Sequence, residues 1–344
     1  MLTVGVIGCG YWGPNLIRNF VNQERSQVKW VSDLSEDRLN HIGRLYPFLQ
    51  KTTNFEDIIN DPEVDAVVVA TPVSSHFKLA MAALEAGKHV FVEKPLAAKS
   101  EESIALTKKA KEKNLVGMVG HTFIYSPAVL KLKELVDSGE LGDIHYLRSR
   151  RLNLGLFQED INVVWDLAPH DLSIFNFLME SSPEAVTAVG QGFVRSDIED
   201  VAFMTLFYPG DRLAHVQVSW LDPNKVRELT VVGSKKMVVY DDNSNLEKIR
   251  IYDKGVDVHP HYDTFGEFQL AYRFGDIHIP RLNDGEPLKD ETGHFLECII
   301  DGVECRSSFA HGHSVVSTLE LACESMRGNG KETSLDPETR ELSK

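Results

Sequence analysis

Short apolar runs alternate with amphipathic stretches along the first third of the chain. The runs at 3–8, 28–33, 65–72, 89–95 and 116–122 are rich in Val, Ile and Phe and are typical of buried strands. Between them, apolar residues recur at helical spacing. Strands that alternate with helices predict a parallel sheet that is covered on both faces. Ligands of such sheets usually bind at the carboxyl ends of the strands.

The pattern changes after residue 122. One helical stretch is followed by many runs with the alternation of strands, including 143–153, 201–208 and 212–221. These runs predict an α+β domain with a large, mostly antiparallel sheet. In VAFMTLFY (201–208) both faces carry apolar side chains, and an exposed apolar face often marks an oligomer contact. The stretch 254–290 has little regular pattern, so we expect a long loop there.

Two domains are therefore expected in the 344 residues: an α/β Rossmann domain with a doubly wound parallel sheet at 1–122, and an α+β domain at 123–344. The net charge of −15 argues against a nucleic-acid partner. No apolar stretch approaches the length that spans a membrane. Four cysteines without a CxxC pair, and no secretory leader pattern, favour a reduced, cytoplasmic setting.

A glycine-rich turn, GCGYWG, follows the first apolar run. Its G-x-G-x-x-G spacing between a strand and a helix lets the pyrophosphate of a dinucleotide approach the backbone. Asp33 ends the next apolar run, 20 residues after Gly13. A carboxylate there accepts hydrogen bonds from the adenine ribose and repels a 2′-phosphate, so NAD is predicted rather than NADP. The turn residues expected at the cofactor are Gly8, Gly10, Tyr11, Trp12 and Gly13.

The segment WDLAPHD (165–171) is a second candidate site. Proline is tolerated in the first turn of a helix, so Pro169 predicts a helix start between Trp165 and Ala168. His170 would then lie near the positive end of the helix dipole, which favours the neutral imidazole that a general base needs. Asp166, four residues earlier, would share its face. The alternative is that Asp166 is a simple N-cap and His170 an ordinary, partly buried surface residue.

No metal site is predicted. Asp166 and His170 offer two ligands, and no HExxH or CxxC motif supplies the others. His259 and His261 lie close together, but in an irregular stretch, and are expected to be solvated.

Basic residues bear on the type of substrate, because an acidic protein needs a local basic pocket to bind a phosphate. In the predicted strand 143–153, Arg148 and Arg150 share one face and Arg151 points to the other. Guanidinium groups suit phosphate, so Arg148 and Arg150 are candidates for a diphosphate. Lys225, Arg227 and Arg281 are further candidates, and the alternative for each is an ordinary solvated cation.

Four motifs occur in a fixed order: G-x-G-x-x-G, ATPVSSH (70–76), EKP (93–95) and D-x-x-x-H (166–170). This order resembles the glucose–fructose oxidoreductase and inositol dehydrogenase family (Gfo/Idh/MocA) over nearly the whole chain. The resemblance implies hydride transfer between a nicotinamide and a carbon of a sugar, cyclitol or polyol. The WDLAPHD variant resembles members that act on nucleotide-linked sugars, notably UDP-N-acetylglucosamine 3-dehydrogenases.

The resemblance also implies roles for individual residues. His170 is expected to remove the hydroxyl proton, Lys94 to hydrogen-bond the same oxygen, and Asp166 to complete the catalytic set. Besides the glycine turn and Asp33, the expected cofactor residues are Thr71, Pro72, His76, Glu93 and Lys94. The expected substrate residues are Lys94, His121, Tyr125, Arg148, Arg150, Trp165, Asp166 and His170.

These expectations lead to an NAD-dependent oxidation of a nucleotide sugar, most simply C3 of UDP-N-acetylglucosamine. Reduction of a keto-sugar, or oxidation of a free polyol, is the first alternative. A non-catalytic NAD-binding regulator is the second. A homodimer or homotetramer formed through the C-terminal sheet is expected.

Overall fold

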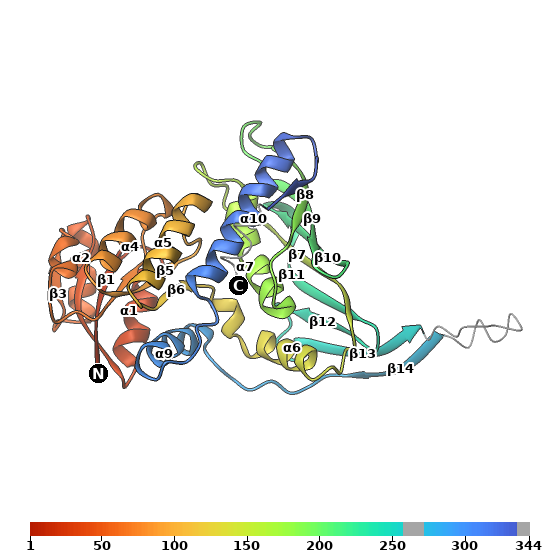
Figure 1. Cartoon of the computed structure of the whole chain (residues 1–344), viewed down its shortest axis with the longest axis horizontal. Helices are drawn as coiled ribbons and strands as arrows, with labels where there is room; N and C mark the ends of the chain where they lie inside the picture. The colour runs from red at the N-terminus through yellow and green to blue at the C-terminus, as the bar shows by residue number, and fades with distance from the viewer. Residues whose placement is uncertain (257–271, 336–344) are drawn as a thin grey trace, which may run out of the picture. The chain divides into compact units, whose positions relative to one another are not determined.

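The computed structural model describes residues 1–256 and 272–335, shown in Figure 1. Contacts divide these residues into two compact units. Unit 1 contains residues 1–126 and 285–320; unit 2 contains 127–256, 272–284 and 321–335. The division therefore differs from a single boundary after residue 122, because the chain returns to unit 1 at residue 285 and leaves it again at 321.

Unit 1 is built around a parallel sheet of six strands in the order β3-β2-β1-β4-β5-β6. The order reverses direction between β1 and β4, which is where such sheets bind ligands at their carboxyl edge. The valines of β4 and β5 are fully buried, as the apolar runs predicted. The strands are β1 (Leu2–Ile7), β2 (Ser26–Ser32), β3 (Gln50–Thr52), β4 (Ala66–Val69), β5 (His89–Glu93) and β6 (Gly117–Gly120).

Helices cover this sheet, which confirms the predicted Rossmann-type α/β fold. Figure 1 shows α4 beside α5 and α1 beside α9. Ser35 caps α2 by accepting a hydrogen bond from the backbone N–H of Arg38. The helices are α1 (Gly13–Asn22), α2 (Glu36–Leu45), α3 (Glu56–Ile59), α4 (His76–Glu85), α5 (Ser100–Glu112) and α9 (Pro287–Ile300), with the 3₁₀ turns η1 (Val73–Ser75) and η2 (Thr122–Tyr125); α10 (Phe309–Arg327) is divided between the two units. In the described part of the chain, no helix has the length and apolar character needed to cross a membrane.

Unit 2 contains a sheet of nine strands in the order β14-β13-β12-β11-β7-β10-β9-β8-β15. All neighbouring pairs are antiparallel except β7 and β10, so the prediction of a large, mostly antiparallel sheet is confirmed. The strands are β7 (Ile144–Leu154), β8 (Ala185–Gln191), β9 (Val201–Tyr208), β10 (Arg212–Ser219), β11 (Leu221–Gly233), β12 (Met237–Asp241), β13 (Ile249–Val256), β14 (Tyr272–His278) and β15 (Thr333–Ser334).

The stretch 254–290 is more regular than its sequence indicated. β13 continues to Val256, β14 pairs with it in antiparallel fashion, and α9 begins at Pro287. The expectation of one long loop was therefore wrong for these residues. Polar and apolar residues are mixed in the paired stretches, so the alternation that marks a strand is weak, and cross-strand hydrogen bonds override it. His259 and His261 lie outside the described residues.

One face of the unit 2 sheet is covered by α6 (Pro127–Asp137) and α7 (Val163–Met179). A buried ion pair fastens α7 to this face: Arg151 Nε of β7 donates to Asp171 Oδ2 at 3.0 Å and Arg151 Nη2 to Asp171 Oδ1 at 3.2 Å. Tyr208 of β9 adds a hydrogen bond to Asn176 of α7 at 2.7 Å. The rotation of α7 on the sheet is thereby fixed.

The stability of unit 2 should depend on this pair. Replacing Asp171 by Ala leaves the Arg151 guanidinium buried without its carboxylate, and we expect a loss of about 3–5 kcal/mol in the free energy of unfolding. Urea denaturation measures it. The double variant Arg151→Met/Asp171→Leu should recover most of the loss, because it removes both charges. Glu112→Ala, which breaks a surface pair with Lys109, is the control and should change stability by less than about 1 kcal/mol. A loss for Asp171→Ala no larger than that of the control would contradict this role.

Candidate active site

The glycine turn between β1 and α1 has the geometry that its sequence predicted. Gly8 has φ +103°, and a Cβ atom on it would lie 2.3 Å from the carbonyl oxygen of Ala70. A Cβ on Gly13 would lie 2.1 Å from the carbonyl oxygen of Gly8, so α1 starts directly against the turn. A Cβ on Gly10 would meet no atom closer than 3.8 Å, which leaves room for a pyrophosphate. Tyr11 is 89% exposed and Trp12 43% exposed beside this open side.

Asp33 follows β2 and lies beside the turn. Its Oδ2 accepts the backbone N–H of Cys9 at 2.7 Å, and its Oδ1 accepts that of Ser35 at 2.8 Å. Arg38 Nη1 lies 3.6 Å from Oδ2. Two backbone donors thus hold the carboxylate at the end of the strand, in the position expected for the acid that binds the adenine ribose.

His76 joins two loops at the carboxyl edge of the sheet. Its Nε2 lies 2.8 Å from the carbonyl oxygen of Thr71, and its Nδ1 lies 2.8 Å from that of Pro95. The ring is buried, and burial lowers its pKa although both carbonyl oxygens favour the protonated ring. His76 therefore positions the loop after β4, which carries Thr71 and Pro72, relative to the loop after β5.

Lys94 directly follows β5, and its peptide bond to Pro95 is cis. Its backbone N–H donates to Glu93 Oε2 at 3.2 Å. Glu93 is buried, and burial raises the pKa of its carboxyl group to about 7. The carboxyl group lies over the backbone of the neighbouring strand: a Cβ on Gly120 would be 3.2 Å from it. The end of β5 therefore presents a lysine beside a carboxyl group that titrates near neutrality.

Two histidines lie near Lys94 within unit 1. The rings of His121 and His311 are 5.5 Å apart, and neither ring nitrogen of His121 has a hydrogen-bond partner among the described residues. Burial, with the nearby His311 and Lys94, lowers the pKa of His121 well below its ordinary value. Burial lowers the pKa of His311 to about 4. Both imidazoles are therefore neutral near pH 7 and are available to bind a polar group.

A second buried acid, Glu291, lies beside the segment that follows β6 in unit 1. Glu291 of α9 accepts the hydroxyl proton of Thr122 at 2.7 Å, while its other oxygen has no partner among the described residues. Burial, and then the charge of Glu93, raises the pKa of Glu291 well above its ordinary value. His311 and Glu291 were not among the predicted site residues. Both come from the part of the chain that returns to unit 1, and nothing in the sequence indicates that return.

Tyr125 occupies a different environment from the one expected. Its side chain has no exposed surface, and its hydroxyl group lies 2.9 Å from Ser307 Oγ. Tyr125 therefore packs in the core of unit 1, and we do not carry it into the proposed substrate set.

The helix start predicted from Pro169 was wrong. α7 begins at Val163, and its N-cap is Asn162, whose side chain accepts the backbone N–H of Trp165 at 3.2 Å. Pro169 lies inside the helix, in the second turn. His170 is thus too far from the helix N-terminus for the dipole to act on it strongly, because that effect fades within the first turn. The alternative in which Asp166 caps the helix was wrong for the same reason.

Asp166 and His170 do lie one turn apart in a continuous helix, as predicted. The indole N–H of Trp220 donates to Asp166 Oδ2 at 2.9 Å, so a buried tryptophan orients this carboxylate. Trp165 is partly exposed, and its side chain lies beside the thiol of Cys323. The contact favours a packing role for Trp165.

The three arginines of β7 divide between the faces of the sheet as predicted. Arg148 and Arg150 both pair with Glu228, at 3.2 and 3.1 Å. Arg151 points to the opposite face, where it binds Asp171 of α7. Arg148 and Arg150 therefore point away from the face that carries Asp166 and His170. A strand pattern identifies which residues share a face, but not which face a helix covers.

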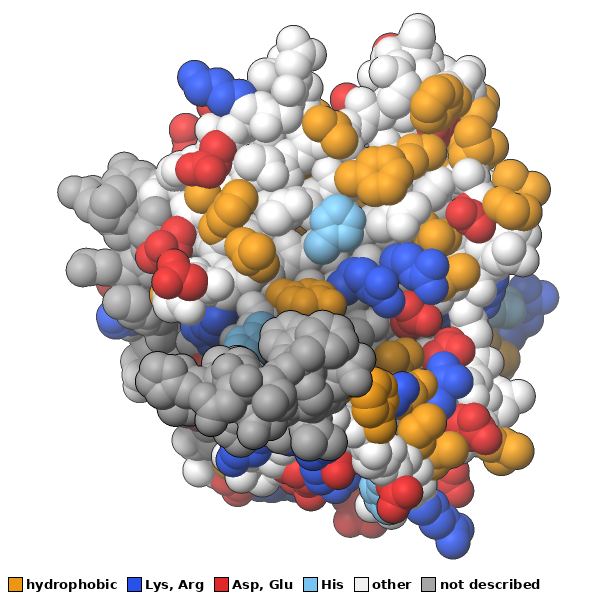
Figure 2. All heavy atoms as spheres, turned by 90° about the vertical axis from the view of Figure 1, so that its right-hand side faces the viewer, with side chains coloured by type: hydrophobic (Ala, Val, Ile, Leu, Met, Phe, Trp, Pro, Cys, Tyr) orange, Lys and Arg blue, Asp and Glu red, His pale blue; other side chains and the backbone are white. Residues whose placement is uncertain are grey.

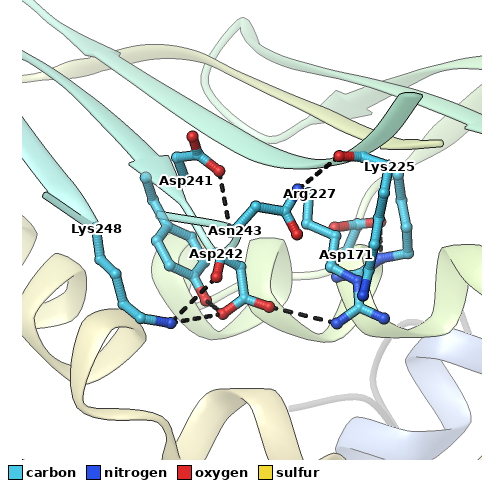
Figure 3. A network of polar contacts seen from close by, with 9 residues as sticks. Asp171, Lys225, Arg227, Asp241, Asp242, Asn243 and Lys248 are labelled. Atoms are coloured by element: carbon cyan, nitrogen blue, oxygen red, sulfur yellow. Dashed lines mark hydrogen bonds and ion pairs between the residues drawn. The ribbon is translucent and has the colours of Figure 1, made fainter. Parts of the chain in front are cut away.

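A polar network extends from Arg151 along the face that α7 covers. Asp242 accepts hydrogen bonds from Tyr240 and Lys248, each at 3.1 Å, and Arg227 Nη1 lies 3.5 Å from its Oδ2. Lys248 and the other donors more than offset the burial of Asp242, so its pKa is lowered. Figure 3 shows Lys225 and Arg227 pointing from β11 toward α7. Arg151, Arg227 and Lys248 pair with the carboxylates of Asp171 and Asp242. Lys225 joins the network through its carbonyl oxygen, which accepts from Asn243, and Asp241 accepts the backbone N–H of the same residue. The network thus contains four cations and three carboxylates, and we call it the basic corner.

Comparison with protein families decides the classification. Residues 2–121 match the model described as "Oxidoreductase family, NAD-binding Rossmann fold", and residues 129–239 match the GFO/IDH/MocA C-terminal domain. The chain belongs to the Gfo/Idh/MocA oxidoreductase family. The resemblance inferred from the four motifs is thereby confirmed, and so is NAD as the cofactor.

The relatives of this Gfo/Idh/MocA chain include enzymes with named substrates. It is 29% identical to the UDP-N-acetylglucosamine 3-dehydrogenase of Acidithiobacillus ferrooxidans, over 75% of this chain and 79% of that protein. A solved structure of that enzyme superposes with a TM-score of 0.81 and 25% identity, over 95% of this chain and 98% of that one. The chain is 28% identical to a scyllo-inositol 2-dehydrogenase (NAD(+)) of Bacillus subtilis, over 86% of each.

Other matches are partial. The chain also matches two uncharacterised oxidoreductases, one from Bacillus subtilis and one from Streptococcus pneumoniae. The match covers 67% of the first protein's length and 61% of the second's. The family and its cofactor are thus established for this chain, while the relatives act on chemically different alcohols.

Proposed function

We propose that this protein oxidises a secondary hydroxyl group of a nucleotide sugar with NAD, and that the hydroxyl is the one on C3 of UDP-N-acetylglucosamine. The observation that carries the proposal is the similarity to the Acidithiobacillus ferrooxidans UDP-N-acetylglucosamine 3-dehydrogenase, which extends over both units. The WDLAPHD segment, which resembles that subgroup in sequence, supports it.

The residues of unit 1 fit the cofactor. The open side at Gly10 admits the pyrophosphate, and Asp33 offers its carboxylate to the adenine ribose. Lys94, His121 and Glu93 follow or end neighbouring strands at the same edge, where the nicotinamide half of a dinucleotide is bound in this fold. NAD, when bound, supplies the acceptor for the hydride that leaves the sugar carbon.

Two groups of the chain are assigned to the proton. His170 takes the proton of the substrate hydroxyl, and Lys94 hydrogen-bonds the same oxygen. With Pro169 in the second turn, the assignment of His170 as the base rests on the family motif and no longer on the helix dipole. Asp166, held by Trp220, is the fixed negative charge one turn before His170 on α7.

The basic corner on the α7 side of the sheet is proposed to bind the diphosphate of the nucleotide. Arg227 is partly exposed there, its guanidinium is shared with Asp242 only at 3.5 Å, and Lys225 lies two residues away. These residues replace Arg148 and Arg150 in the proposed substrate set, because the latter point to the opposite face and are paired with Glu228.

A free polyol is the second candidate substrate, and the similarity to the scyllo-inositol 2-dehydrogenase of Bacillus subtilis favours it. Reduction of a keto-sugar is the same chemistry in reverse. A non-catalytic NAD-binding regulator is the least favoured reading, because the lysine and histidine of the family motifs are both present.

Substrate and roles are tested together by following NADH formation with UDP-N-acetylglucosamine and with myo- and scyllo-inositol. We expect kcat/KM to be at least about 100-fold higher for the nucleotide sugar.

Lys94→Ala and His170→Ala should each lower kcat by about 10²- to 10⁴-fold, since each removes a group that handles the proton. Lys99→Ala and His41→Ala, at exposed positions, are the matched controls and should keep wild-type turnover. Preference for an inositol would move the protein to the second candidate, and near-normal turnover of either test variant would remove its assigned role.

The diphosphate site is tested by a pair of arginine variants. Arg227→Ala should raise KM for UDP-N-acetylglucosamine about 10-fold or more, because a charged hydrogen bond to phosphate contributes about 1.5–3 kcal/mol. Arg148→Ala should leave KM within about twofold. The reverse result, a higher KM for Arg148→Ala only, would restore the arginines first expected from the sequence.

The face of the unit 2 sheet opposite α6 and α7 is proposed to form the contact between copies of the chain. Tyr146, Val189, Phe203 and Leu213 are each between 42% and 51% exposed on strands of this sheet, and Figure 2 shows hydrophobic side chains gathered on the face. We expect wild-type protein to be a dimer or tetramer by light scattering and Phe203→Asp to shift it toward the monomer. A monomeric wild type at micromolar concentration would contradict this contact.

A further inference from the structure

Three potential metal ligands, none of them assigned to the cofactor or the substrate, come together in unit 1. His294 and Cys298 lie one turn apart on α9, and Cys305 follows in the segment after the helix. One ligand atom from each residue lies within 4.8 Å of the others. Cys298 Sγ and His294 Nε2 are 3.4 Å apart. This cluster could not be predicted from its residue spacing, because H-x₃-C-x₆-C belongs to none of the common metal motifs.

The tautomer of His294 suits a metal ligand. The backbone N–H of Arg306 donates to Nε2 at 3.2 Å, and a backbone N–H only donates, so this nitrogen carries a lone pair and no proton. The other ring nitrogen, Nδ1, must then carry the proton, and it lies 3.5 Å from the carboxylate of Glu297. Metal-binding histidines usually donate the proton of the second nitrogen to a carboxylate, which orients the ring and makes it more basic. Here Nδ1 forms no hydrogen bond among the described residues, so Glu297 would take this role by moving closer when the ion binds.

We propose that His294, Cys298 and Cys305 bind a single Zn²⁺ ion. Zinc bonds of about 2.3 Å to sulfur and about 2.0 Å to nitrogen, at a tetrahedral angle, place a sulfur and a nitrogen ligand about 3.5 Å apart. The observed 3.4 Å between Cys298 Sγ and His294 Nε2 needs little change. Both thiols lose their protons to water when the ion binds, and Nε2 gives up the hydrogen bonds donated to it.

The charge and burial of the cluster favour a divalent ion. Two thiolates neutralise Zn²⁺, so the complex carries no net charge in surroundings where His294 is 3% and Cys298 5% exposed. Cys305 is partly exposed, which leaves room for a water molecule as the fourth ligand. Thiolate and imidazole ligands select zinc over magnesium and calcium, which require oxygen.

The ion would stabilise the segment that adds to β6. Ser307, two residues after Cys305, accepts the backbone N–H of Val119 at 2.8 Å, and its hydroxyl group binds Tyr125. Ser308 forms a bridge with Met118 of β6. A metal that links α9 to Cys305 therefore holds the segment that borders β6, the strand that leads to His121. We assign the ion a structural role.

Cobalt(II) reports the site directly. The full-length protein is reduced, freed of metal with a chelator, and titrated with Co²⁺. We expect a thiolate-to-cobalt charge-transfer absorption that saturates at one ion per chain, with visible bands of tetrahedral intensity, and its loss when Zn²⁺ is added. Zinc should also raise the melting temperature of the metal-free protein. These readouts on the wild type do not depend on any variant folding.

Variants then locate the ion. Cys298→Ser and Cys305→Ser should each weaken Co²⁺ binding by more than about 100-fold, and Glu297→Gln by about 10-fold. Cys323→Ser is the matched control, because Cys323 lies in unit 2 beside Asn162 and should leave the absorption unchanged. Circular dichroism checks that each variant is folded.

Three results would overturn the proposal. The first is a Co²⁺ titration without a thiolate charge-transfer band. The second is a band that survives in both folded variants of the cluster. The third is a Cys298–Cys305 disulfide, found by peptide mapping, in metal-free protein that was purified without a chelator.

Discussion

A buried ion pair between Arg151 and Asp171 determines the orientation of α7, and therefore the positions of the proposed catalytic side chains of unit 2. Arg151 and Asp171 are 9% and 5% exposed at their side chains, so each charge depends on the other, and their two parallel hydrogen bonds allow one orientation of α7 on the sheet. Successive helix residues are rotated by about 100°, so fixing Asp171 also fixes His170 beside it and Asp166 more than a turn before. The same pair places Arg151 beside Arg227 and Asp242, and thereby makes one corner of the sheet basic.

In unit 1, backbone packing and backbone hydrogen bonds, rather than a buried ion pair, hold the loops at the sheet edge in place. Gly8 and Gly13 leave no space for side chains, so the turn after β1 can take only one path, and two backbone N–H groups hold Asp33 beside it. His76 fixes the loops after β4 and β5 by its contacts with two carbonyl oxygens. The side chains that we propose for the cofactor follow parallel strands, which end at one edge of the sheet.

Local sequence patterns predicted most of the fold and part of the candidate site. Apolar runs identified the strands, the glycine spacing and Asp33 identified the NAD turn, and alternation placed Arg148 and Arg150 opposite Arg151. One error was local: Asn162 caps α7 through the backbone N–H of Trp165, three residues later, and so puts Pro169 in the second turn. The other errors came from interactions between distant residues. The helix covers the face of Arg151, and the return of residues 285–320 brings His311, Glu291 and the His294 cluster into unit 1. These two depend on tertiary packing, which a single sequence does not reveal.

The central claim is that hydride leaves C3 of UDP-N-acetylglucosamine for NAD. Deuterium at C3 of the sugar tests it most directly, with the nicotinamide analysed by mass spectrometry and proton NMR. We expect one deuterium at C4 of the reduced nicotinamide for each 3-keto sugar formed, and a slower reaction if hydride transfer limits the rate. Reduced nicotinamide without deuterium, formed from the same substrate, would show that another carbon is oxidised and would contradict the account.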